Sequence, residues 1–151
     1  MMRTLAMLCA AVIATGCVRT ATNPATGKVD VDIESPTKKG EDWKGTINAV
    51  NSAINGEVRA NVANGQTNVT LSLTGGSNGQ SNMWMIHEGR CGSPGAGFGS
   101  MSQYPNARFD ANGRATVNVT LPGRLDEAKD YVVVIHGQDM NTVVACGDLD
   151  D

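Results

Sequence analysis

From Trp43 to the end of the chain, apolar and polar residues alternate in short runs separated by turns rich in Gly, Asn and Asp. Alternation with a period of two is typical of strands that bury one face. The predicted strands share this pattern and span residues 46–50, 56–62, 68–73, 82–87, 106–110, 115–121, 131–136 and 142–146. Eight short strands with almost no helical periodicity predict an antiparallel all-β sandwich or barrel.

Turn residues indicate how some of these strands connect. The stretch Ala63-Asn-Gly-Gln66 predicts a tight hairpin between the second and third strands. Asn112-Gly113 predicts another hairpin, which would pair residues 106–110 with 115–121. The segment 92–104 is rich in Gly, Ser and Pro, has no periodicity and is expected to be a long loop.

The strand around residues 82–87 combines a core face with a chemically distinctive face. Trp84 and Ile86 are expected to point into the core, and Met83, Met85 and His87 to point the other way. The only other histidine, His136, ends the strand 131–136. A cysteine follows each strand, Cys91 after the first and Cys146 after the second. The two strands are therefore candidates for a shared site.

Composition limits the other possibilities. The 151 residues suffice for one domain with appendages, and only 4% are aromatic, so Val, Ile, Leu and Ala must build the core. The formal net charge is −3 and no block of basic residues occurs, which argues against nucleic-acid binding.

The N-terminus has the pattern of an export signal. Arg3 precedes an apolar stretch too short to span a bilayer, and Ala14-Thr-Gly-Cys17 follows it. This resembles the lipobox of bacterial lipoproteins, which implies a signal peptide over 1–16, removal of Cys9 with it, and lipidation at Cys17. The residue after Cys17 is Val18 and not Asp, and in Gram-negative lipoproteins this implies an outer-membrane anchor facing the periplasm. A plain secretory signal with an incidental cysteine is the alternative.

The next segment is expected to be a flexible tether. Residues 17–42 are rich in Thr, Pro, Asn, Lys and Asp, and Asn23-Pro24 and Ser35-Pro36 break any helix. Within it, residues 28–33 alternate cleanly enough for one short strand. The chain is therefore expected to consist of a signal peptide, a lipidated tether and a β domain over 43–151.

The two histidine–cysteine blocks resemble Cu/Zn superoxide dismutases. Trp84–Cys91 is similar to that family's segment with paired copper histidines before a disulfide cysteine, and Val132–His136 with Val144–Gly147 is similar to its last copper histidine and second disulfide cysteine. Gln103–Asn106 and Asp110–Ala115 resemble a further stretch more weakly. The resemblance implies an eight-stranded Greek-key sandwich, copper at His87 and His136, and a Cys91–Cys146 disulfide, which also suits an oxidising envelope.

Several metal positions of that family are changed in this chain. The first copper histidine corresponds to Met85, the metal-bridging histidine to Gly97 and the zinc aspartate to Gln103. The loop that should hold zinc contains no histidine, so we expect no zinc site. The arginine that guides superoxide corresponds to Val143, and an aspartate after the last copper histidine corresponds to Met140. These changes predict little or no dismutase activity.

The remaining donors suit Cu(I). Thioether and imidazole ligands in low coordination favour Cu(I) over Cu(II), and the expected set is Met85, His87 and His136, with Met83 or Met140 as a further sulfur. A protein that stores Cu(I), or exchanges it with a donor or acceptor protein, is the first hypothesis. A metal-free structural or interaction module of the cell envelope is the second, and a copper-only dismutase of low activity is the third.

Overall fold

The computed structural model describes residues 19–22, 29–32 and 42–151. The chain divides into two compact units, residues 1–38 and 39–151, which are treated separately. In the first unit, β1 (Arg19–Thr22) and β2 (Val29–Asp32) pair antiparallel. β2 confirms the expected strand at 28–33, whereas β1 was not predicted. Cys17 and the signal-like segment lie outside the described residues.

The second unit contains ten strands and one short 3₁₀ helix. Their bounds are β3 (Asp42–Ala49), β4 (Asn55–Ala63), β5 (Gln66–Thr74), β6 (Ser81–Asn82), β7 (Trp84–Arg90), β8 (Ser93–Gly97), η1 (Met101–Gln103), β9 (Ala107–Arg108), β10 (Arg114–Pro122), β11 (Tyr131–His136) and β12 (Val143–Leu149). Among the described residues, none lies in a helix long and apolar enough to cross a membrane.

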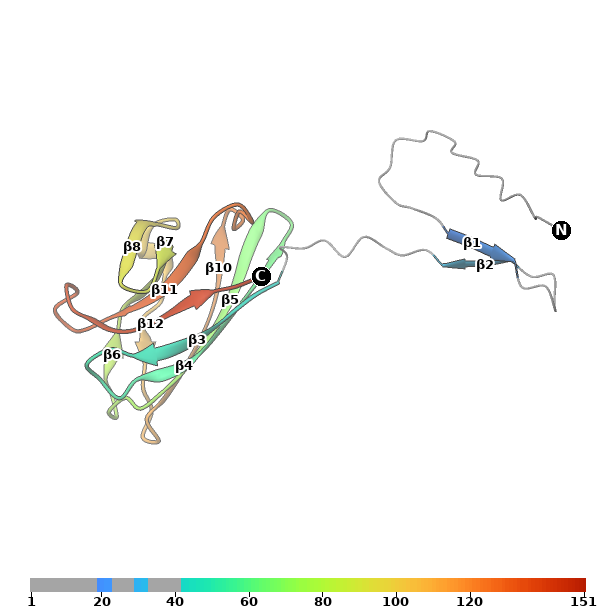
Figure 1. Ribbon diagram of the computed structural model, residues 1–151. Coiled ribbons are helices and arrows are strands. Elements are labelled where there is room, and N and C mark those ends of the chain that lie inside the picture. Colours follow the sequence, from blue (N-terminus) through green and yellow to red (C-terminus); the bar gives the residue numbers. More distant parts are fainter. Residues whose placement is uncertain (1–18, 23–28, 33–41) are drawn as a thin grey trace. The chain divides into compact units, whose positions relative to one another are not determined.

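Eight of these strands form one antiparallel sheet in the order β10-β5-β4-β3-β12-β11-β7-β8. The sheet curls into a half-barrel, with β3, β4 and β5 on one side and β7 and β11 on the other (Figure 1). The all-β class was predicted from sequence, and seven of the eight strands of this sheet, all except β8, coincide with predicted strands. The predicted hairpin at Ala63–Gln66 is present and joins β4 to β5.

Two parts of the expected strand pattern are wrong. Residues 92–104 are not a loop throughout, because β8 pairs with β7 and η1 follows it. The expected pairing of 106–110 with 115–121 is absent: β9 pairs with β6, and β10 pairs with β5. The turn itself is present, since the Asp110 carboxylate accepts backbone N–H bonds from Asn112 (2.8 Å) and Arg114 (2.9 Å).

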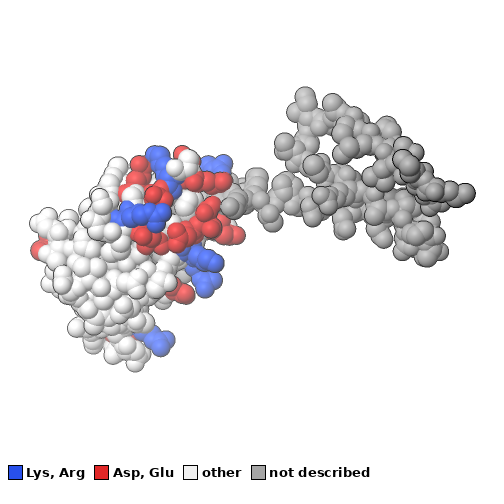
Figure 2. Space-filling model, viewed as in Figure 1, with Lys and Arg blue, Asp and Glu red and all other residues white. Residues whose placement is uncertain are grey.

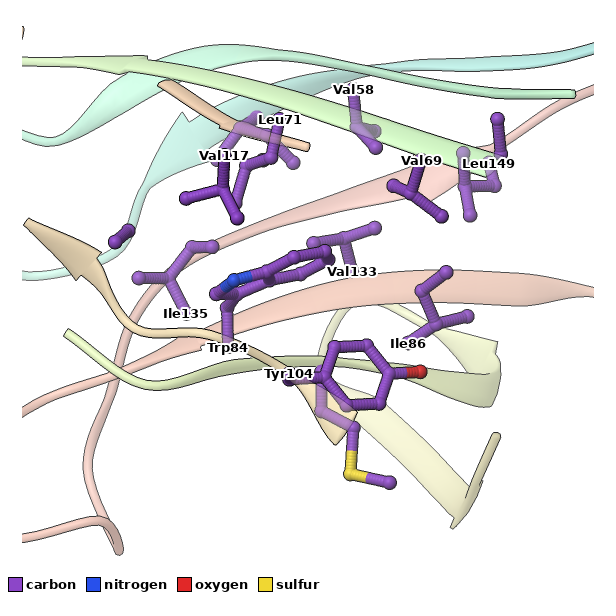
Figure 3. Close-up of a cluster of buried hydrophobic side chains, with 14 of the residues drawn as sticks. Val58, Val69, Leu71, Trp84, Ile86, Tyr104, Val117, Val133, Ile135 and Leu149 are labelled. Carbon is purple, nitrogen blue, oxygen red and sulfur yellow. The ribbon is translucent and has the colours of Figure 1, made fainter. Parts of the chain in front are cut away.

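The core fills the inside of the curled sheet. Side chains from β7 and β11, including Trp84, Ile86 and Ile135, point toward Leu71 and Val117 on the opposite side (Figure 3). The Trp84 ring packs edge-on against Tyr104, and its N–H donates to the Pro105 carbonyl (2.9 Å). Trp84 and Ile86 are almost fully buried, as predicted from the alternation in this strand.

Charged side chains gather over one end of the second unit, and most of the remaining surface in this view is uncharged (Figure 2). Ion pairs are present at the C-terminal end of β7. Arg90 pairs with Asp130 (2.8 Å), and Lys129 donates to Glu88. These pairs tie the end of β7 to the segment before β11. Glu88 is thus a hydrogen-bond acceptor.

Candidate metal site

The register of β7 and β11 sets the geometry of the candidate site. His87 lies opposite Val132, and Met85 lies opposite Val134. The backbone N–H of His136 donates to the carbonyl of Met83 (2.8 Å). Paired residues in a sheet share a face, so both histidines and Met85 lie on the face opposite Trp84 and Ile86.

The two histidine side chains converge along this face. His136 lies four residues beyond Val132, the partner of His87. At roughly 3.3 Å per residue, that offset corresponds to about 13 Å along the strands. The ring centroids are nevertheless only 6.2 Å apart, so the side chains lean toward each other over the row formed by Met85 and Val134.

Each histidine lies at an irregularity of the sheet. The register of β11 against β12 shifts between Ile135 and His136. The register of β7 against β8 shifts between His87 and Gly89. β-bulges bend a strand and redirect its side chains, and they are frequent beside functional sites. These two register shifts explain why the imidazole rings lie closer together than a regular pair of strands would place them.

The hydrogen bonding of His87 fixes its tautomer. Its Nδ1 lies 3.1 Å from the carbonyl oxygen of Gly95 on β8. A carbonyl can only accept, so Nδ1 carries the proton and Nε2 presents its lone pair. That Nε2 is buried and has no hydrogen-bond partner. A backbone carbonyl on one imidazole nitrogen with the other left free is the usual arrangement of a metal-ligating histidine.

His136 has even fewer partners. Both of its ring nitrogens are buried without a hydrogen bond. Burial, followed by the proximity of His87, lowers the pKa of His136. The Met140 backbone and the Asp139 carboxylate favour the protonated ring and partly offset this lowering of the pKa. Neither group forms a hydrogen bond with a ring nitrogen of His136. The neutral imidazole is favoured, which is the form that binds metal.

These three nitrogens stand out among the described residues. The buried side-chain nitrogen and oxygen atoms without a hydrogen-bond partner are His87 Nε2, His136 Nδ1 and His136 Nε2. An unsatisfied buried polar group costs about 1–3 kcal/mol, so native structures contain few of them, and an ion or water often explains them. The concentration of all three atoms at one place marks it as a candidate binding site.

Met85 is buried, although the alternation in its strand places it on the face opposite the core residues Trp84 and Ile86. It shares the face of the histidines, but its side chain is only 6% exposed and packs with the main core cluster. Its Sδ lies 3.0 Å from the position that a Cβ at Gly97 would take, and its Cε lies closer still. Gly97 is opposite His87 on β8. The Met85 thioether therefore occupies the space in which a side chain at position 97 would begin.

The structure also shows where the remaining positions named in the comparison with dismutases lie. Val143 lies opposite His136, and Val134 and Val143 line an apolar cavity of about 160 Å³ beside the disulfide. Gln103 accepts a hydrogen bond from the Ser100 backbone (2.8 Å), so its side chain serves the turn around η1. Cys91 and Cys146 form a disulfide with Cα atoms 5.8 Å apart, as expected.

The sequence did not indicate two contributors to the site. Gly95 fixes the His87 tautomer through its carbonyl, and no side-chain pattern can report a carbonyl. The pairing of a small residue at 97 with a large one at 85 appears only once β8 lies beside β7. Within the described residues, no group of three or more His, Cys, Asp or Glu side chains is arranged to hold a metal ion.

Comparison with known proteins identifies no family: neither a family model nor a curated protein matches this chain.

Proposed function

We propose that this protein binds Cu(I) through the Nε2 of His87, a ring nitrogen of His136 and the thioether of Met85. The observation that carries the proposal is the set of three buried, partnerless imidazole nitrogens on two rings 6.2 Å apart. A bound ion would satisfy the nitrogens that face it and remove part of their desolvation cost. Copper would supply only a soft Lewis-acid centre, and the chain would hold it between buried donor atoms.

The spacing of the rings fits one shared ion of low coordination number. Bonds between a metal and an imidazole nitrogen are about 2 Å long, so two rings on one ion have centroids roughly 4.5 to 6.3 Å apart. The observed 6.2 Å lies at the wide end, which corresponds to a nearly linear arrangement of the two nitrogens. Cu(I) accepts low coordination with imidazole and thioether donors, whereas Cu(II) and Zn(II) require more ligands.

We further propose kinship with the Cu/Zn superoxide dismutases. The connections from β5 to β7 and from β10 to β11 support it, because each crosses from one half of the sheet to the other, as Greek-key connections in sandwiches do. The positions of His87, His136 and the disulfide agree with this relationship. In this account the site has lost the bridging imidazole, which corresponds to Gly97, and has gained the Met85 thioether in the same space.

Dismutase turnover is the weaker alternative. Val143 stands opposite His136 and contributes to an apolar cavity rather than a cationic approach. Cycling of copper also requires ligands that serve Cu(II), and the proposed donor set favours Cu(I). We therefore expect a copper-storing or copper-transferring protein, with a donor or acceptor protein as its partner, and no efficient superoxide dismutase.

The cell envelope is the proposed location. The pattern Ala14-Thr-Gly-Cys17 supports lipidation of Cys17 and an outer-membrane anchor facing the periplasm. The Cys91–Cys146 disulfide agrees with this placement, because disulfides persist in oxidising compartments. A second account, a metal-free interaction module in the same location, draws support from the burial of Met85 in the core.

An anaerobic titration of the full chain with Cu(I) against a chromophoric chelator separates these accounts. We expect one ion per chain, loss of binding in His87→Ala and His136→Ala, and weaker binding in Met85→Leu. The matched control is Met101→Leu, because Met101 is an exposed methionine outside the proposed ligand set. Parallel titrations with Zn(II) and Cu(II) should show much weaker binding. Absence of stoichiometric Cu(I) binding would favour the metal-free module.

A further inference from the structure

Met140 is an unusual residue beside the proposed copper site. It belongs to the turn between β11 and β12, four residues after His136. Among the residues that the structure describes, the exposed large apolar side chains are those of Met101 (43%) and Met140 (50%). An exposed methionine has little packing value, but its thioether is a soft ligand for Cu(I).

The turn places Met140 next to His136. The N–H of Met140 donates to the carbonyl of Gly137 (3.1 Å), and the N–H of Gly137 donates to the carbonyl of Thr142 (2.7 Å). The first bond closes a four-residue turn that starts directly after His136. Asp139 braces the turn by accepting from both the N–H and the hydroxyl of Thr142.

The backbone conformation of Met140 is strained. Among the described residues, three other than glycine have a positive φ: Asn51, Asn64 and Met140, the last with φ 61°. Asparagine is enriched in this left-handed region, whereas methionine is uncommon there. Asn or Gly would suit this backbone conformation better than methionine does. Such an outlier is a reason to look for a function of its side chain.

We propose that Met140 supplies a solvent-facing thioether ligand to the Cu(I) ion held by His87 and His136. This inference rests on the proposed function, and it adds the ligand through which the ion enters and leaves. The exposed thioether of Met140 would be accessible to Cu(I) from solvent, whereas the buried imidazoles would hold the ion. All of these donors are neutral, so binding would require no transfer of a proton or an electron.

Titration with silver(I), a redox-inert ion of similar softness, tests the assignment. The full chain carries ¹³C-methyl methionine, and single substitutions assign the signals. We expect the Met140 methyl signal to shift with one equivalent of silver(I), and the Met101 signal to stay in place. Met140→Asn should weaken silver(I) binding about tenfold or more, as loss of a supporting ligand does. Met101→Asn is the matched control and should bind as wild type does.

The melting temperatures of the same variants distinguish a ligand role of Met140 from a merely structural one. Met140→Asn should raise the melting temperature of the metal-free protein, because it relieves the left-handed strain. A more stable protein that binds silver(I) more weakly supports the ligand assignment. If wild type binds silver(I) but Met140→Asn and Met101→Asn bind equally well, the Met140 inference is overturned and the His87–His136 site stands. If wild type binds no silver(I), both proposals fall.

Discussion

His87 and His136 lie on neighbouring strands, four residues out of register, yet their rings approach to 6.2 Å. Between them they contribute all three of the buried, partnerless side-chain nitrogens found in the described part of the chain. The tautomer of His87 leaves its lone pair on the buried Nε2. The relationship between these two residues is the basis of the copper proposal.

Tyr104 predicts a loss of stability at alkaline pH. Its hydroxyl donates to the Phe98 carbonyl (2.6 Å), and burial raises its pKa to about 12, an effect that the Ile86 backbone partly offsets. A raised pKa means that the folded state retains the proton longer than the unfolded chain does. The Tyr104 contribution is therefore complete below pH 10 and is lost as pH rises from about 10 to about 12.

Chemical denaturation across this pH range measures the effect. Tyr104→Phe should cost about 1 kcal/mol near neutral pH through the lost hydrogen bond, and its stability should decline less from pH 10 to 12 than that of wild type. Phe109→Leu is the control, because it alters a buried aromatic residue without removing a titrating group, and its alkaline decline should match that of wild type. Equal declines in wild type and Tyr104→Phe would contradict the assignment.

The disulfide is predicted to be a major contributor to stability. Cys91 and Cys146 are 55 residues apart in sequence, and closing a loop of that length stabilises by about 4 kcal/mol on the chain-entropy model. Cys91→Ser should lower the melting temperature and increase hydrogen exchange in β8, which follows Cys91 directly. Wild type in reductant should behave as the variant does. Two free thiols in protein purified from the envelope would be the contrary result.

Gly97 and Met85 are predicted to be coupled. A Cβ at position 97 would collide with the end of the Met85 side chain, which is flexible enough to move aside. Gly97→Ala should therefore destabilise by only about 1 kcal/mol, as modest overpacking does, but should shift Met85 and weaken Cu(I) binding. In a Met85→Ala background the same change should cost less stability, and a double-mutant cycle measures this coupling. Additive effects would rule out the contact.

Lipidation at Cys17 predicts a membrane-bound mature protein. Expression of the full chain in a Gram-negative host followed by fractionation and mass spectrometry gives the test. Wild type should carry a lipid on Cys17 and sediment with the membrane, whereas Cys17→Ser should lose the lipid and become soluble or remain uncleaved. Cys9→Ser is the control, since Cys9 lies in the apolar stretch that cleavage removes. Membrane association that is unchanged in Cys17→Ser would refute the proposal.

Alternation made most of the sheet predictable. In β5 the apolar residues Val69, Leu71 and Leu73 alternate with polar ones, and β10 alternates in the same way from Ala115 to Leu121; one-sided burial requires that pattern. β8 escaped prediction because its sequence, Ser-Pro-Gly-Ala-Gly, has no large side chain and all five residues are exposed. Only its backbone pairing with β7 defines it as a strand. The false hairpin arose because Asn112-Gly113 does form a turn, but the strands on either side find their partners elsewhere.

The candidate site was predictable only in part. Sequence spacing put Met85 and His87 on one face, and the resemblance to dismutases suggested His136 as their partner. The convergence of the rings depends on the pairing of β7 with β11, which are far apart in sequence, and on two register shifts, at Ile135–His136 and at His87–Gly89, that apolar–polar alternation does not reveal. The burial of Met85 depends on β8, the strand that sequence patterns could not predict.

X-ray absorption spectroscopy of the Cu(I)-loaded full chain tests the central claim most directly. We predict imidazole nitrogens at about 2.0 Å and sulfur at about 2.3 Å, the usual distances for these ligands. His136→Phe should abolish this spectrum while leaving the metal-free protein at least as stable, because it replaces two unsatisfied buried nitrogens with an apolar ring. A wild-type spectrum without imidazole scattering, or one that His136→Phe leaves unchanged, would contradict a copper site shared by His87 and His136.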